Sequence, residues 1–123
     1  MLDPVLIVLI AIAGGLGSII RLFMGQWRGK MPWGTLMANI TASLILGFIQ
    51  VFTHWGLNNP LATGVVYLGF CGGLSTFSAV VADTGDFWRE HEYVKAGANL
   101  LANLTLPVVA LWMPVMVLVV LVN

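Results

Sequence analysis

The chain has 123 residues, of which 59% are hydrophobic and only 8% are charged, with five Lys and Arg residues balancing five Asp and Glu residues. Soluble domains carry about a quarter charged residues, so this composition excludes an ordinary soluble domain, and without a basic tail or charge run nothing favours nucleic-acid binding. The one cysteine, Cys71, can build neither a disulfide nor a thiolate metal cluster within the chain.

Four apolar stretches of the sequence approach or exceed the roughly 20 residues that a helix needs to cross a bilayer core. We predict helices at residues 2–24, 33–52, 61–88 and 94–122, which with their short connections occupy residues 1–123 as a single transmembrane domain. The first stretch carries Asp3 in place of a basic leader and has no clear cleavage site, so we expect a span rather than a signal peptide. The sequence therefore predicts an all-α, multi-pass protein of the cell membrane, embedded in the lipid bilayer.

The third stretch contains an unusual run, Gly72-Gly73-Leu74-Ser75-Thr76, near its centre. Two adjacent glycines followed by two hydroxyl residues weaken helix propagation. A break at mid-membrane leaves amide and carbonyl groups that need protein or water as partners, and discontinuous transporter helices use such groups to hold ions. The alternative is a glycine pair that lets two helices pack closely. The local pattern leaves both interpretations open.

Polar residues recur at helical spacing in the second and fourth stretches. The second carries Thr35, Asn39, Ser43 and Gly47, four residues apart, and the fourth carries Asn99 and Asn103. A buried asparagine in a membrane needs protein, water or a ligand as its partner. The asparagines either join helices by hydrogen bonds or offer their amide N–H donors to a small, strongly hydrated anion.

Ionisable and nucleophilic residues favour structural roles. Arg21 and Asp83 lie deepest in their apolar stretches, and we expect both to be structural charges that anchor the helices. His54 and His91 fall in separate predicted loops and make no metal site. The hydroxyls near Ser75 have no histidine base close in sequence, so we predict that the protein is not an enzyme.

Three motifs resemble those of the Fluc/CrcB family of fluoride channels. The segment GGLGSIIR at residues 14–21 is similar to the family's glycine-rich first helix, which ends in arginine. The segment GTLMAN at residues 34–39, with Gly47 further on, resembles its second-helix signature. The segment GFCGGLSTFS at residues 69–78 closely resembles its broken third helix. Order, spacing and chain length agree, and the resemblance covers nearly the whole sequence.

The resemblance implies a passive fluoride-selective channel that exports cytoplasmic fluoride and reduces its toxicity. It implies an antiparallel, dual-topology dimer with two pores and a structural sodium ion at the dimer centre, held by the backbone carbonyls of Gly72 and Ser75. It also favours a third helix broken at mid-membrane over simple packing of the glycine pair. The fluoride pathway that it implies consists of Asn39, Phe77, Ser78, Asn99 and Asn103.

The sequence departs from the family pattern along this pathway. A threonine, a second phenylalanine and a glutamate are expected where Ala79, Val80 and Asp83 stand, and Pro107 replaces a small or hydroxylated residue. The electropositive ring edge of Phe77 remains to face an anion, but Val80 removes a second aromatic edge. We therefore expect either an altered anion pathway or the impairment of one of the two pathways.

The charge distribution bears on the second subunit. Loops one and three, on one side of the membrane, hold Arg28, Lys30, Arg89 and Lys95, and the other side holds no lysine or arginine. The positive-inside tendency then places both termini outside. The partner is either a second copy, giving a homodimer, or an oppositely oriented homologous chain that supplies missing pore groups.

The sequence leaves two alternatives to a fluoride channel. One is a non-conducting or partner-dependent subunit of a heteromeric channel. The other is a small multidrug exporter, which the sequence favours less because such exporters need a carboxylate within the first helix, where only Asp3 is present at its start.

Overall fold

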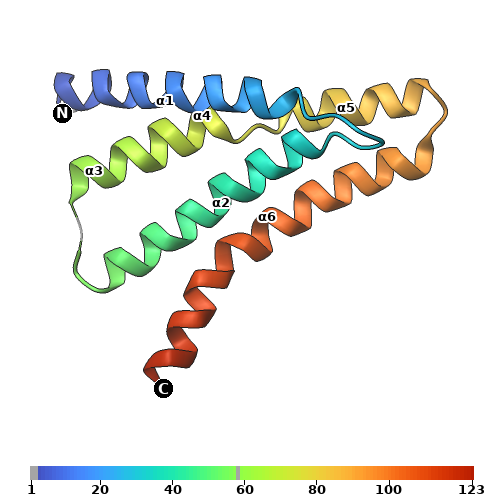
Figure 1. Ribbon diagram of the computed structural model, residues 1–123. Coiled ribbons are helices and arrows are strands. Elements are labelled where there is room, and N and C mark those ends of the chain that lie inside the picture. The colour runs from blue at the N-terminus through green and yellow to red at the C-terminus, as the bar shows by residue number, and fades with distance from the viewer. Residues whose placement is uncertain (1–2, 58) are drawn as a thin grey trace.

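The computed structural model describes residues 3–57 and 59–123, and every regular element in those residues is a helix (Figure 1). The elements are α1 (Pro4–Gly25), α2 (Trp33–His54), α3 (Pro60–Gly64), the π-helical segment η1 (Val65–Cys71), α4 (Gly72–Leu74), α5 (Ser78–Arg89) and α6 (Tyr93–Val122). Four helical spans are long and apolar enough to cross a membrane: α1, α2, Pro60–Arg89 and α6. The prediction of an all-α, multi-pass membrane protein is confirmed. Position 2, where the first helix was predicted to begin, lies outside the described residues.

Two of the spans begin with the same local chemistry. The Asp3 carboxylate accepts a hydrogen bond from the Val5 N–H at 3.0 Å, and Pro4 occupies the first helical position. Asn59 likewise accepts from two backbone N–H groups at the start of α3, with Pro60 directly after it. An Asx cap satisfies orphan donors, and proline has no N–H to leave unpaired at that position.

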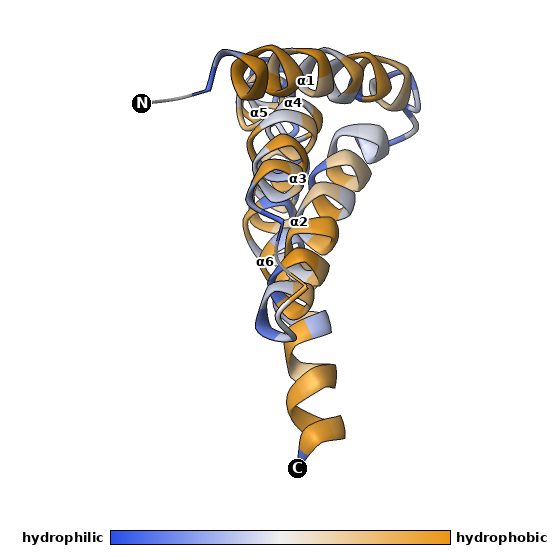
Figure 2. Cartoon of the chain, turned by 90° about the vertical axis from the view of Figure 1, so that its left-hand side faces the viewer, coloured by the Kyte–Doolittle hydropathy of each residue, from blue (hydrophilic) through white to orange (hydrophobic). Residues whose placement is uncertain are grey.

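The connections lie at two opposite ends of the molecule (Figure 1). The α1–α2 connection at residues 26–32 and the α5–α6 connection at residues 90–92 lie near one another, whereas the α2–α3 connection lies at the far end. Helix α2 packs along α6, and α1 packs along η1 and α4. Hydrophobic residues dominate the helices in Figure 2, as expected of surfaces that face lipid.

Glycines allow α1 to lie directly against the third span. A Cβ at Gly73 would overlap the backbone of Gly14, and one at Gly17 would overlap the backbone of Phe70. By contrast, a Cβ at Gly72 would meet nothing within 4 Å. The two members of the glycine pair thus differ: Gly73 permits the close helix contact, while Gly72 borders open space.

Candidate functional site

The third span is not helical at residues 75–77. Helix α4 ends at Leu74, Ser75 is extended with φ −77° and ψ 148°, and α5 begins at Ser78. Asn39, from α2, pairs with the exposed peptide groups: the Thr76 N–H donates to Asn39 Oδ1 at 2.8 Å, and Asn39 Nδ2 donates to the Thr76 carbonyl at 3.1 Å. One buried side chain therefore satisfies both backbone groups of a residue where lipid offers no partner.

A chain of three asparagine amides continues from this contact. Asn39 Nδ2 also donates to Asn103 Oδ1 at 2.9 Å, and Asn103 Nδ2 donates to the carbonyl and the Oδ1 of Asn99 at 3.0 and 3.1 Å. Asn99 Nδ2 then donates to Thr84 Oγ1 at 3.0 Å and to the Val80 carbonyl at 3.4 Å. All three asparagines are buried. The amide chain joins α2, α6 and α5, and its members support one another because each polar group in it is paired.

The same contacts leave two backbone carbonyls without their helical donors. In an uninterrupted helix the N–H groups of Thr76 and Ala79 would donate to the carbonyls of Gly72 and Ser75. Here Thr76 donates to Asn39 instead, and Ala79 donates to the Thr76 hydroxyl at 3.3 Å. In residues 3–57 and 59–123, no backbone N–H of a turn, loop or helix cap donates to either carbonyl. Carbonyl oxygens are ligands of hard cations, so Gly72 and Ser75 fit the sodium site that the resemblance implies.

An open groove of about 250 Å³ lies beside the interruption. It is lined by Asn39, Ser43, Ser75, Thr76, Phe77, Asn103 and Pro107. Phe77, one of the lining residues, is 58% exposed. The lining combines hydroxyls, amides and one aromatic ring, which is a mixture suited to a small polar solute.

The predicted pathway residues divide between the groove and its surroundings. Asn39, Phe77 and Asn103 line the groove. Ser78 lies outside the lining, at the start of α5, with its hydroxyl 3.0 Å from that of Thr76. Asn99 is buried behind the groove, between α5 and α6. The structure thus brings three of the five together as a surface and places the other two in support of it.

Other residues of the groove region were named in the sequence without being assigned to the pathway. Ser43 and Thr76 line the groove, and Ser43 follows Asn39 by four residues, a spacing that puts both on one helix face. Pro107 also lines it, and since proline has no N–H, the Asn103 carbonyl one turn earlier loses its helical donor. Val80 is fully buried and does not line the groove.

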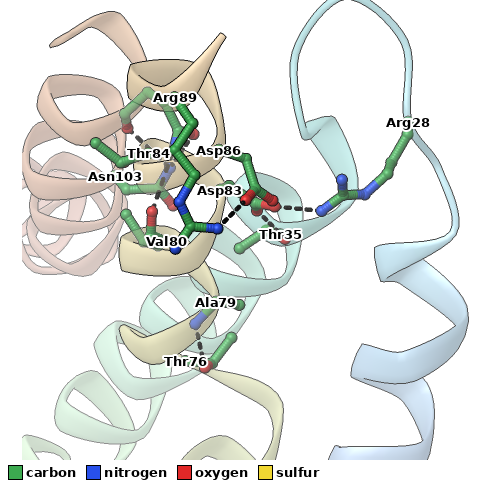
Figure 3. A network of polar contacts seen from close by, with 11 residues as sticks. Arg28, Thr35, Thr76, Ala79, Val80, Asp83, Thr84, Asp86, Arg89 and Asn103 are labelled. Carbon is green, nitrogen blue, oxygen red and sulfur yellow. Dashed lines mark hydrogen bonds and ion pairs between the residues drawn. The ribbon is translucent and has the colours of Figure 1, made fainter. Parts of the chain in front are cut away.

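A buried carboxylate ties the α1–α2 connection to the third span (Figure 3). Asp83 is 5% exposed, forms an ion pair with Arg28 and accepts a hydrogen bond from Thr35 Oγ1 at 3.3 Å. The pair formed by Asp86 and Arg89 is longer, at 3.6 Å, and largely exposed, so it contributes little. Asp83 therefore holds a loop and α2 against α5.

Arg21, the other predicted structural charge, is partly exposed near the end of α1. Within the described part of the chain, no ion pair involves it. Its anchoring role stays a prediction.

Comparison with known proteins gives a consistent set of relatives. Residues 8–115 match the model of the family described as CrcB-like protein, Camphor Resistance (CrcB). A protein of Thermococcus gammatolerans named fluoride-specific ion channel FluC is 40% identical over 99 residues, which cover 76% of this chain and 80% of the relative. Proteins of the same name from Thermococcus kodakarensis and Nitrobacter winogradskyi are each 38% identical, covering 80% and 85% of this chain and 84% and 88% of their own lengths. The family match includes every residue that lines the groove.

Proposed function

This chain belongs to the CrcB-like family, and we propose that it is a passive fluoride-specific ion channel of the cell membrane. The relatives that carry that name match this chain over most of their length. The observation that carries the proposal is the polar groove beside the interruption of the third span, to which the family-like motifs contribute Asn39, Ser75, Thr76 and Phe77. Conduction requires no covalent step, so the protein is not an enzyme. Its activity lets cytoplasmic fluoride leave the cell and so lowers its toxicity.

Fluoride passes along the groove in this proposal. A small anion gives up its hydration shell only where other donors replace water, and conduction requires that these donors bind it weakly enough to release it. The ring edge of Phe77 carries partial positive charge and meets the anion without a strong bond. Asn39 and Asn103 form the polar wall, with Ser78 and Asn99 supporting it.

The groove is open on one side, which supports a second, antiparallel subunit that covers it. Phe77 is exposed and Gly72 borders open space, so a facing chain has room to approach both. We place a sodium ion between the two subunits, held by the carbonyls of Gly72 and Ser75 that lack helical donors. Bound there, sodium supplies positive charge near the route of the anions.

A second candidate, a partner-dependent subunit, is favoured by the charge distribution. The five basic residues of the chain all lie near the end formed by residues 26–32 and 90–92: Arg21, Arg28, Lys30, Arg89 and Lys95. Basic residues favour the cytoplasmic side, so the chain favours one orientation. An antiparallel neighbour is then a homologous chain of opposite orientation more readily than a second copy. The multidrug exporter has no support, because α1 contains no carboxylate.

The channel proposal is tested by fluoride efflux from liposomes that contain this purified chain as their only protein, with chloride efflux measured alongside. We expect fluoride-selective efflux that Phe77→Leu lowers about three- to tenfold, since it removes the aromatic edge. Phe23→Leu is the matched control, because Phe23 is 65% exposed on α1 and does not line the groove. Fluoride efflux through this variant should equal that through the wild type. Absence of efflux from a folded preparation contradicts the homodimeric channel.

Orientation decides between the two kinds of partner. Cysteines introduced by Gly29→Cys and Leu57→Cys lie at opposite ends of the molecule, and the native Cys71 is buried. A membrane-impermeant thiol reagent added to intact cells should label Leu57→Cys alone if the chain has one orientation. Equal labelling of both variants would establish dual orientation and support the homodimer.

A further inference from the structure

Most hydrogen-bond donors of the groove are already engaged within the chain. The amide nitrogens of Asn39 and Asn103 each make two hydrogen bonds to protein acceptors. The Thr76 hydroxyl lies 3.0 Å from that of Ser78 and accepts from the Ala79 N–H. An anion entering the groove therefore finds these groups occupied, and binding to them requires breaking bonds that hold the interruption in place.

Ser43 differs from the other groove residues in this respect. It lies on α2, one turn after Asn39, and is partly buried in the groove wall. Helical hydroxyls commonly donate to the carbonyl four residues earlier, as Thr53 and Thr105 do here at 2.8 Å. Within residues 3–57 and 59–123, no hydrogen bond to Ser43 is present among the side-chain contacts. Its O–H is thus free to donate to whatever occupies the groove.

Ser75 is the other groove hydroxyl without such a contact, but its position is different. It lies in the interruption itself, where its own carbonyl has lost its helical donor and is a proposed ligand of sodium. Ser43 stands on an uninterrupted helix whose own carbonyls are engaged, and its backbone is held in place by the neighbouring contact of Asn39 with Thr76.

We propose that the Ser43 hydroxyl donates a hydrogen bond directly to fluoride as the ion crosses the groove. The inference rests on the proposed channel function and adds a ligand to it. A single hydroxyl suits this task, because one neutral donor replaces one water of the hydration shell yet releases the ion readily. The asparagine chain then keeps the groove in shape while Ser43 and the Phe77 ring contact the ion.

The test compares Ser43→Thr with Ser43→Val, two side chains of nearly the same shape of which only threonine has a hydroxyl. We expect Ser43→Thr to keep fluoride efflux within about threefold of the wild type and Ser43→Val to lower it about tenfold or more, as for a lost hydrogen bond to a charged group. Thr105→Val is the control, because it removes an exposed hydroxyl bonded to its own helix, and its efflux should not change.

The outcomes separate this inference from the channel function. If the wild type does not conduct fluoride, the proposed function fails. If the wild type conducts and Ser43→Thr and Ser43→Val have equal rates, whether high or low, the hydroxyl has no role and the inference is overturned. Ser43→Ala adds no bulk and so guards against misfolding: a folded Ser43→Ala channel should lose efflux as Ser43→Val does, and wild-type efflux from it would also overturn the inference.

Discussion

Helices α2 and α6 are held together by two different kinds of contact along their length. Near the interruption, the contact is polar: Asn39 donates to Asn103 at 2.9 Å within a buried amide chain. Further along, the contact is apolar and close: a Cβ at Gly47 would overlap the backbone of Leu111 and lie 3.1 Å from Pro114 Cδ. One pair of helices therefore uses hydrogen bonds at one end and backbone proximity at the other.

The difference shows where packing alone suffices in a membrane. Lipid is as apolar as a leucine side chain, so helices associate through close van der Waals contact and hydrogen bonds rather than through the hydrophobic effect. The Gly47 contact requires nothing but a small residue. The Asn39 contact must in addition satisfy the Thr76 peptide groups, and the groove with Asn39, Thr76 and Asn103 in its wall lies on this side. The polar contact therefore shapes the groove as well as joining the two helices.

The largest effect is expected where the polar contact is removed. Asn39→Leu leaves the N–H and carbonyl of Thr76 without their partner, and each unsatisfied buried group costs about 1–3 kcal/mol. We expect fluoride efflux to fall about a hundredfold or more. Two unsatisfied groups together destabilise the conducting shape of the groove by about 2.8 kcal/mol or more, and that free energy corresponds to a factor of about one hundred. Liposome efflux and thermal unfolding in detergent would measure both losses.

Gln50→Leu provides the control for that variant. It replaces an exposed amide by leucine on the same helix, away from the groove, and should leave efflux unchanged. Wild-type efflux from Asn39→Leu would show that the interruption holds its shape without the amide.

A smaller effect, in stability and not in selectivity, is expected at the apolar contact. Alanine usually stabilises a helix over glycine by about 1 kcal/mol. Gly47→Ala should instead destabilise the protein by about 1–3 kcal/mol, because the methyl group of the alanine must push α6 away. Unfolding in detergent at increasing temperature measures the change, while the fluoride-to-chloride ratio of the remaining channels stays that of the wild type.

Gly97→Ala is the matched variant, since a Cβ at Gly97 in α6 meets nothing within 4 Å. It should be neutral or stabilising. Equal stability changes at Gly47 and Gly97 would mean that the close approach of α2 and α6 is not required.

The smallest effect is expected at the charged end, where Asp83 joins Arg28 and Thr35 (Figure 3). Asp83→Asn keeps the shape and removes the charge, so we expect a loss of about 1–2 kcal/mol in stability and less than about a threefold change in efflux. Asp86→Asn, at the exposed pair with Arg89, should cost about 0.5 kcal/mol or less. A larger change at Asp86 than at Asp83 would contradict the structural role of the buried carboxylate.

The sequence predicts some of the residues that line the groove but not the role of each. The family resemblance predicts Asn39, Phe77 and Asn103 as pathway residues, and all three line the groove. Ser43 shares the helical face of Asn39, a signal that was visible in the sequence, but its free hydroxyl emerges only when the neighbouring donors are seen to be engaged. Asn99 carries the same side chain as Asn103 and lies one turn earlier on the same face of α6, yet it lies behind the groove because α5 packs over that part of α6.

The number and nature of the spans were determined by the sequence alone. Each span is a local sum of apolar residues, and a backbone in lipid must satisfy its own hydrogen bonds, so length and hydropathy suffice to predict a helix. The choice of partners was decided by tertiary structure. Asn39 and Thr76 are 37 positions apart, and Arg28 and Asp83 are 55 apart. Whether such groups meet depends on how each helix is rotated and how closely its glycines let it approach, which no local pattern of residues specifies.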